Sequence, residues 1–144
     1  GSNYNVYTDL TGLSGSITPT VTTSKVFLSG HVMLAILSRT MLIRIMRSIA
    51  GSGYVEVGSG PVVGARIGAH SSIITDSNSN GPAPASIHFV DTPSFSSGQA
   101  ITYKIQARDS DLTGQAWWCN AGVNDSNTGA WARTISGFTI QELL

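Results

Sequence analysis

The residues best suited to bind a ligand gather near the C-terminal end of the sequence. Trp117 and Trp118 are adjacent, and Trp131 follows a polar stretch that contains Asn124 and Asp125. An indole ring stacks on the apolar face of a sugar, while carboxamide and carboxylate groups bridge pairs of hydroxyls. These five residues are our candidate ligand-binding site. Burial of the same rings between subunits is the commoner alternative for an indole that faces outward.

Other side-chain patterns indicate less chemistry. Asp109 and Asp111 form a D-x-D pair, and oxygen-rich turns of this kind hold Ca²⁺, although Asp is also an ordinary turn former. His31, His70 and His88 lack the spacing of metal ligands. No nucleophile motif is present, and the Gly-rich GSGYVEVGSG lacks the following helix that phosphate binding requires. We therefore expect no enzyme and no cofactor, with Ca²⁺ as the alternative that stays open.

Composition limits the partners. The 144 residues include 8 Lys and Arg and 8 Asp and Glu, so the net charge is zero and charged residues make up 11%. Such a chain lacks the cationic face that binds nucleic acid or anionic lipid. Its longest apolar stretch, residues 26–37, is shorter than the ~20 residues of a membrane-spanning helix. Neither nucleic acid nor membrane insertion is expected, and the single cysteine, Cys119, excludes an intrachain disulfide.

The elements that must position these residues are predicted to be β-strands, because Ser, Thr, Asn and Gly punctuate β-branched runs at short intervals. Residues 40–50 also fit an amphipathic helix, but their alternation and the following GSG favour a strand. An exposed loop is expected at 76–85. Gly1 and Ser2 are typical of a cleaved tag, so residues 1–3 are expected to be a tag remnant and linker and 4–144 one domain. Strands are predicted at 5–9, 14–18, 25–36, 40–50, within 51–60, and at 61–69, 86–91, 101–108, 115–120 and 134–143.

Two of these strands make specific predictions. Adjacent residues on a strand point to opposite faces, so at most one of Trp117 and Trp118 can lie in the core. The strand at 25–36 is apolar on both faces, and only one face can meet its own core. The other face is predicted to meet a neighbouring layer or subunit; its residues are Phe27, His31, Met33 and Ala35.

Three segments resemble bacteriophage virion and tail-fibre proteins. HFVDTPSFSSGQAITYKIQAR is similar to a strand of these proteins that ends in a D-x-P turn and is followed by an aromatic strand. QAWWCNAGVNDSNTGAWARTISGFTIQELL resembles their final hairpin, and DLTGLSGSITPTVTTSKVFLSGHV their opening. The hairpin positions that match are Trp118, Asn120, Arg133, Ile135, Thr139, Ile140, Glu142 and Leu143.

The resemblance, over about residues 4–144, implies an all-β fold: an antiparallel β-sandwich of jelly-roll, TNF/C1q-like type with about eight to ten strands. It implies a homotrimer at the tip of a fibre, located on the virion and attached to a host-surface glycan or protein, and no catalytic residues. Phe27, His31, Met33 and Ala35 would line the three-fold axis, and the strand at 134–143 would be central. The alternatives are a purely structural capsid-decoration or fibre-knob protein, and a carbohydrate-binding module of a secreted enzyme.

Overall fold

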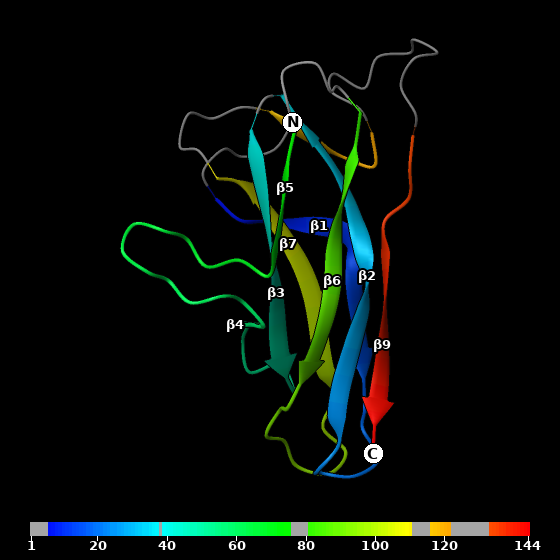
Figure 1. Ribbon diagram of the computed structural model, residues 1–144. Helices are drawn as coiled ribbons and strands as arrows, with labels where there is room; N and C mark the ends of the chain where they lie inside the picture. The colour runs from blue at the N-terminus through cyan, green and yellow to red at the C-terminus, as the bar shows by residue number, and fades with distance from the viewer. Residues whose placement is uncertain (1–5, 38, 76–80, 111–115, 122–132) are drawn as a thin grey trace.

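The computed structural model describes residues 6–37, 39–75, 81–110, 116–121 and 133–144 (Figure 1). These residues form two antiparallel sheets packed face to face, so the predicted all-β sandwich is confirmed. No helix in the described ranges is long and apolar enough to cross a membrane. The strands are β1 (Thr8–Ile17), β2 (Lys25–Ile36), β3 (Thr40–Ile49), β4 (Val55–Val57), β5 (Ser71–Ile74), β6 (Ala83–Asp91), β7 (Ile101–Asp109), β8 (Trp117–Cys119) and β9 (Gly137–Leu143).

One long strand organises each sheet. In sheet A the order is β1-β7-β3, and β4 and β5 both pair with the free side of β3. In sheet B, β6 pairs with one side of β2, while β9 and β8 share the other side. The Thr40–Ile49 segment is thus a strand paired on both sides, and the helical alternative is wrong because its odd-numbered residues meet sheet B across the core.

The core lies between the sheets and follows the alternation of the sequence. Val26, Leu28 and Val32 of β2 point inward, opposite Ile43 and Ile45 of β3, and all five are fully buried. Burying one such side chain stabilises the fold by about 1.5–3 kcal/mol. This inward parity leaves Phe27, His31 and Met33 on the outer side of sheet B, as the two-faced pattern predicts.

β1 is one strand with an irregularity, not the two strands predicted at 5–9 and 14–18. Its register against β7 shifts between Asp9 and Ser14, and Gly12 adopts a φ of 82° within the shift. The extra residue moves the inward positions from even to odd numbers, so Leu10 and Leu13 are both buried. A strict two-residue alternation therefore breaks in the sequence although the strand continues.

Other expectations about strands and loops require correction. The segment 61–69 is not a strand, because only Val63 and Arg66 form a bridge there. β5 was not predicted, because its four residues gain their strand conformation from pairing with β3. β6 begins at Ala83, inside the expected loop, and its Pro84 is tolerated because β6 pairs with β2 alone among the described strands. Residues 76–80 of that loop lie outside the described residues.

β9 is an edge strand, not the predicted central strand. Among the described strands it pairs only with β2, and Figure 1 shows it at one side of the sandwich. Its backbone lies so close to β2 that a Cβ on Gly30 would collide with the Gly137 carbonyl and with Phe138. The Glu142 carboxylate accepts hydrogen bonds from the Thr20 backbone N–H at 2.6 Å and the Ser24 hydroxyl at 2.6 Å. β9 is therefore fixed at its edge position by both close approach and hydrogen bonds.

A buried polar cluster links the two sheets. Arg47 Nη1 of β3 donates hydrogen bonds to both carboxylate oxygens of Asp91 of β6, each at 2.8 Å. The Tyr103 hydroxyl of β7 donates to the same carboxylate at 2.7 Å. Tyr103 is fully buried and Asp91 nearly so. Burial, and next the hydrogen bond to Asp91, raises the pKa of Tyr103 above its ordinary value. The cluster ties the central strand of sheet A to the edge of sheet B.

Candidate functional site

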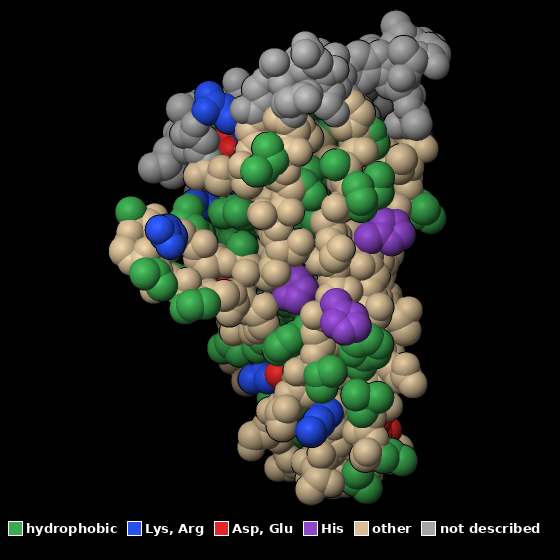
Figure 2. All heavy atoms as spheres, viewed as in Figure 1, with side chains coloured by type: hydrophobic (Ala, Val, Ile, Leu, Met, Phe, Trp, Pro, Cys, Tyr) green, Lys and Arg blue, Asp and Glu red, His purple; other side chains and the backbone are tan. Residues whose placement is uncertain are grey.

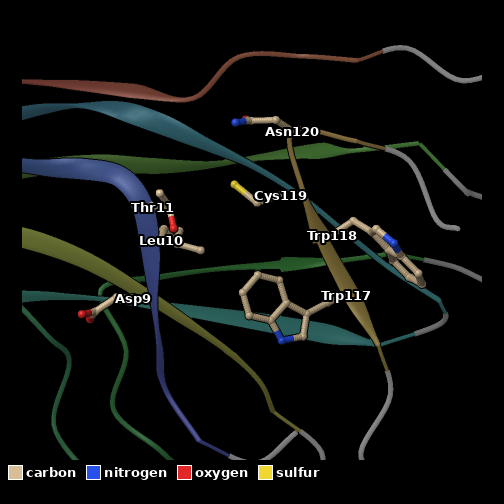
Figure 3. Close-up of a pocket in the computed structure, with 7 residues that line it drawn as sticks. All are labelled: Asp9, Leu10, Thr11, Trp117, Trp118, Cys119 and Asn120. Carbon is tan, nitrogen blue, oxygen red and sulfur yellow. The ribbon is translucent and has the colours of Figure 1, made fainter. Parts of the chain in front are cut away.

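A pocket of about 340 Å³ opens between β1 and β8, where one strand of each sheet comes to the side of the sandwich (Figure 3). Its volume is at the lower end of the ~300–1,000 Å³ typical of small-molecule sites. Its lining comes from the irregular part of β1 and from β8 with the residue that follows. The lining residues are Asp9, Leu10, Thr11, Trp117, Trp118, Cys119 and Asn120.

The two adjacent tryptophans separate as predicted. Trp117 pairs with Ile36 and is 3% exposed within the core, whereas Trp118 pairs with Ala35 and is partly exposed. Figure 3 shows the two rings pointing in different directions from β8. Only Trp118 therefore keeps indole surface that a partner or ligand can reach.

The buried indole of Trp117 carries a donor without a described partner. Trp117 Nε1 has no hydrogen-bond partner among the described residues. A buried donor that lacks a partner costs about 1–3 kcal/mol relative to a satisfied one. This nitrogen has no accessible surface, so a ligand in the pocket does not reach it.

Asn120 joins β8 to the segment before β9. It adopts the left-handed conformation, with a φ of 61°, which Asn tolerates better than most residues. Its N–H donates to the Met33 carbonyl at 2.9 Å, and its own carbonyl accepts from the Thr134 N–H at 2.9 Å. Its side-chain oxygen accepts the Ser136 hydroxyl. This rim of the pocket is therefore held by hydrogen bonds from three directions.

The pocket offers no acid–base pair. The Asp9 carboxylate accepts hydrogen bonds from Lys104 Nζ at 2.9 Å and from Gln106 Nε2 at 2.6 Å. The hydrogen bond from Lys104 is the main reason that the pKa of Asp9 lies below its ordinary value. In Figure 3 this carboxylate points away from Trp117. Burial raises the pKa of the Cys119 thiol, which disfavours the nucleophilic thiolate. Among the described lining residues, the Asp9 carboxylate is therefore engaged by two donors and the Cys119 thiol is held in its protonated form.

The predicted ligand-binding residues are only partly placed. Trp117 and Trp118 both line the pocket, but Asn124, Asp125 and Trp131 lie outside the described residues. Sequence reasoning missed the contributions of β1 and of Asn120. The signal for β1 was Gly12 between Leu10 and Leu13, a spacing of three that marks a bulge in an otherwise alternating strand.

Of the two candidate Ca²⁺ ligands, the structure describes only Asp109. Asp109 is fully buried at the end of β7, and Asp111 lies outside the described residues. Within the described ranges no three His, Cys, Asp or Glu side chains are grouped closely enough to hold a metal ion.

The predicted interface residues lie on the outer face of sheet B, which Figure 2 views directly. Phe27 and Met33 are partly exposed and His31 is exposed, but Ala35 is fully buried within the chain. Phe27 packs edge-on against His88, with ring centroids 5.1 Å apart. By register, their outward-facing neighbours are also uncharged; they are Ser29, Pro84, Ser86, Val90, Thr139 and Gln141. Between the levels of Phe27 and Ala35 the described strands thus present an outer surface without a charge.

The outer face of sheet A is charged and internally paired. Arg44 reaches Glu56 at 3.1 Å, and Lys104 reaches Asp9 at 2.9 Å. The Arg44 guanidinium also lies 3.9 Å from the centre of the Tyr7 ring, a cation–π distance. Asp9, Arg44, Glu56 and Lys104 are therefore paired on the surface of a single chain.

The sequence matches no protein-family model, and it matches no curated protein.

Proposed function

We propose that this chain is the homotrimeric tip domain of a bacteriophage fibre or virion structural protein, of jelly-roll type, that attaches to the host surface through glycans. The observation that carries the proposal is the uncharged stretch of the outer face of sheet B between the levels of Phe27 and Ala35, beyond Lys25 at the start of β2, on a chain whose other outer face is charged. A subunit interface that buries such a face removes little charge from water, so its desolvation cost is low. The sequence resemblance to phage fibre proteins supplies the trimer and the virion setting.

The face has the composition that a three-fold contact requires. Phe27 and Met33 supply apolar area, while His31, Ser29 and Ser86 supply hydrogen-bonding groups. Copies of one strand around a three-fold axis bring identical residues close together, which a charged residue would oppose. Ala35 has no accessible surface left, so the axis would be lined by Phe27, His31 and Met33.

The glycan part of the proposal rests on the pocket between β1 and β8. Its accessible lining includes the exposed Thr11 hydroxyl, the Asn120 side chain and the partly exposed Trp118 ring. A monosaccharide offers hydroxyls for the first two groups and an apolar face for the third. One such site is expected to be weak, and three copies on one tip would raise the avidity.

Sedimentation equilibrium tests the assembly. We expect a species of three times the 15.1 kDa of one chain. Ser86→Glu places a carboxylate in the middle of the sheet B face and should yield monomer, because three like charges then meet. Ser72→Glu is the matched control, since Ser72 is an exposed strand serine on sheet A. A monomeric wild type, or a Ser86→Glu variant that stays trimeric, contradicts the proposed interface.

A glycan array on the wild-type trimer tests the ligand. We expect binding that Thr11→Ala and Trp118→Ala both abolish while the trimer and its melting temperature stay unchanged. Ser14→Ala, also exposed on β1 but outside the pocket, is the control. A trimer that binds no glycan favours the purely structural role in the virion, whereas a monomer that binds glycans favours a carbohydrate-binding module.

A further inference from the structure

An arm of residues 59–70 projects from the side of the sandwich between β4 and β5 (Figure 1). It has a defined hairpin conformation: the Gly60 N–H donates to the Ala69 carbonyl at 3.0 Å, and the Arg66 N–H to the Val63 carbonyl at 3.1 Å. A Cβ on Gly68 would collide with the Gly60 carbonyl, so glycine permits the two sides to approach. The arm is therefore a structured finger that extends away from its own core.

The base of the arm is held by His70. Its backbone N–H donates to the Ile43 carbonyl at 2.9 Å, and its Nε2 accepts the His88 N–H at 3.2 Å. Because Nε2 is an acceptor, Nδ1 carries the proton that is donated to the Gly58 carbonyl at 2.8 Å. His70 thus connects the arm to both sheets and fixes the direction in which the arm projects.

The arm exposes apolar side chains that its own chain does not cover. Val62 is 74% exposed, Val63 56% and Ile67 43%, and Arg66 is the one charged residue of residues 59–70. Eight consecutive residues, 60–67, are exposed. Side chains of this kind on a structured finger are typical of a contact with another molecule.

A surface hollow without Lys, Arg, Asp or Glu, lined by both hydroxyl and apolar side chains, lies between β2 and β9. It has a volume of about 390 Å³. Ile135 on its rim is 78% exposed, and a Cβ on Gly137 would meet nothing within 4 Å, so the hollow is open. Figure 1 shows the arm on one side of the sandwich and β9 on the opposite side.

We propose that the arm of one copy packs into the hollow between β2 and β9 of a second copy. This inference rests on the homotrimer proposed above. Ser29 and His31 line the hollow and also belong to the proposed contact face, so the arm would cover that face from its β9 side. Each copy has one arm on one side and one hollow on the other, so successive contacts around a three-fold axis close the ring and leave no arm uncovered. An uncharged hollow accepts Val62 and Val63 without the desolvation of a charge.

Filling the hollow is the sharpest test. Gly137→Leu adds a side chain where the single chain has open space, so the subunit should fold normally while the neighbouring arm loses its place. We expect the trimer dissociation constant in sedimentation equilibrium to rise about tenfold or more. Gly81→Leu is the matched control, because Gly81 also has open space around its Cβ position and lies far from the hollow in the sequence.

The arm side of the contact is tested independently. Val62→Asp should weaken the trimer as Gly137→Leu does, whereas Ile74→Asp, at a residue 77% exposed on β5, should leave it unchanged. In a Cys119→Ser background, oxidation of a Val63→Cys/Ile135→Cys double variant should link three chains by disulfides, whereas each single variant can link two chains at most. A wild-type trimer that tolerates Gly137→Leu and Val62→Asp overturns the arm contact alone. A monomeric wild type overturns the homotrimer and this contact together.

Discussion

The two sheets place their charges in opposite ways. Sheet A carries Asp9, Arg44 and Lys104 on its outer face, where each is paired within the chain. Sheet B turns its strand carboxylates, Asp91 and Glu142, away from its outer face and toward partners in the same chain. The difference is the basis of the proposed trimer, in which the outer face of sheet B and not the charged face of sheet A is the contact surface.

The hidden carboxylate of sheet B should matter most to folding. Asp91→Ala leaves Arg47 and Tyr103 without their buried partner, and we expect the free energy of unfolding to fall by about 3–5 kcal/mol. Urea denaturation followed by tryptophan fluorescence measures this loss. A loss below that of a surface ion pair would show that Asp91 does not link the sheets.

The close approach of β9 to β2 should have the next largest effect. Gly30→Ala forces the added Cβ against the backbone of Gly137 and Phe138, so we expect a loss of about 1–3 kcal/mol and disturbance of the outer face of sheet B. Gly81→Ala, where nothing lies within 4 Å of the added Cβ, should leave stability nearly unchanged. Equal melting temperatures for the two variants would contradict the close approach.

The outcome for each strand shows which parts of the fold are local. Alternating residue types over 25–36 and 101–108 predicted strands whose every second side chain faces the core, and the structure has such strands there. The prediction works because side chains on one face of a strand recur every two residues. The segment 40–50 was ambiguous by composition, and pairing on both sides makes it a strand. β9 was misplaced because a strand's position in a sheet depends on distant partners that its own residues do not specify.

The candidate site divides in the same way. That one tryptophan of the pair is buried and the other partly exposed follows from two adjacent residues on any strand. Leu10 and Thr11 lie across a pocket from the two tryptophans. This placement depends on the bulge at Gly12 and on the packing of the two sheets. The pocket residues of β1 and β8 are more than a hundred positions apart in the sequence. A local sequence pattern therefore does not reveal that they meet.

The hydroxyl of Tyr103 should contribute less than its partner carboxylate. Tyr103→Phe removes one hydrogen bond to Asp91 and keeps the ring, so we expect a loss of about 0.5–1.5 kcal/mol at neutral pH. Because burial raises the pKa of Tyr103 in the folded state, its contribution is complete below the ordinary tyrosine pKa of about 10 and is lost as the pH rises above it. Stability measured from pH 8 to pH 11 should therefore fall more steeply for the wild type than for Tyr103→Phe. Parallel curves would contradict this assignment.

The displayed carboxylate of sheet A should have the smallest effect. Asp9→Asn breaks an exposed ion pair with Lys104, and such pairs contribute about 0–1 kcal/mol. Its pKa is lowered in the folded state, so its contribution is present above the ordinary Asp pKa of about 4 and is lost as the pH falls below it. Unfolding at pH 6 and pH 3 should show a smaller acid-induced loss for Asp9→Asn than for the wild type, and added salt should reduce the difference because exposed charges are screened. If Asp9→Asn instead destabilises the chain as much as Asp91→Ala, the distinction between displayed and hidden carboxylates is wrong.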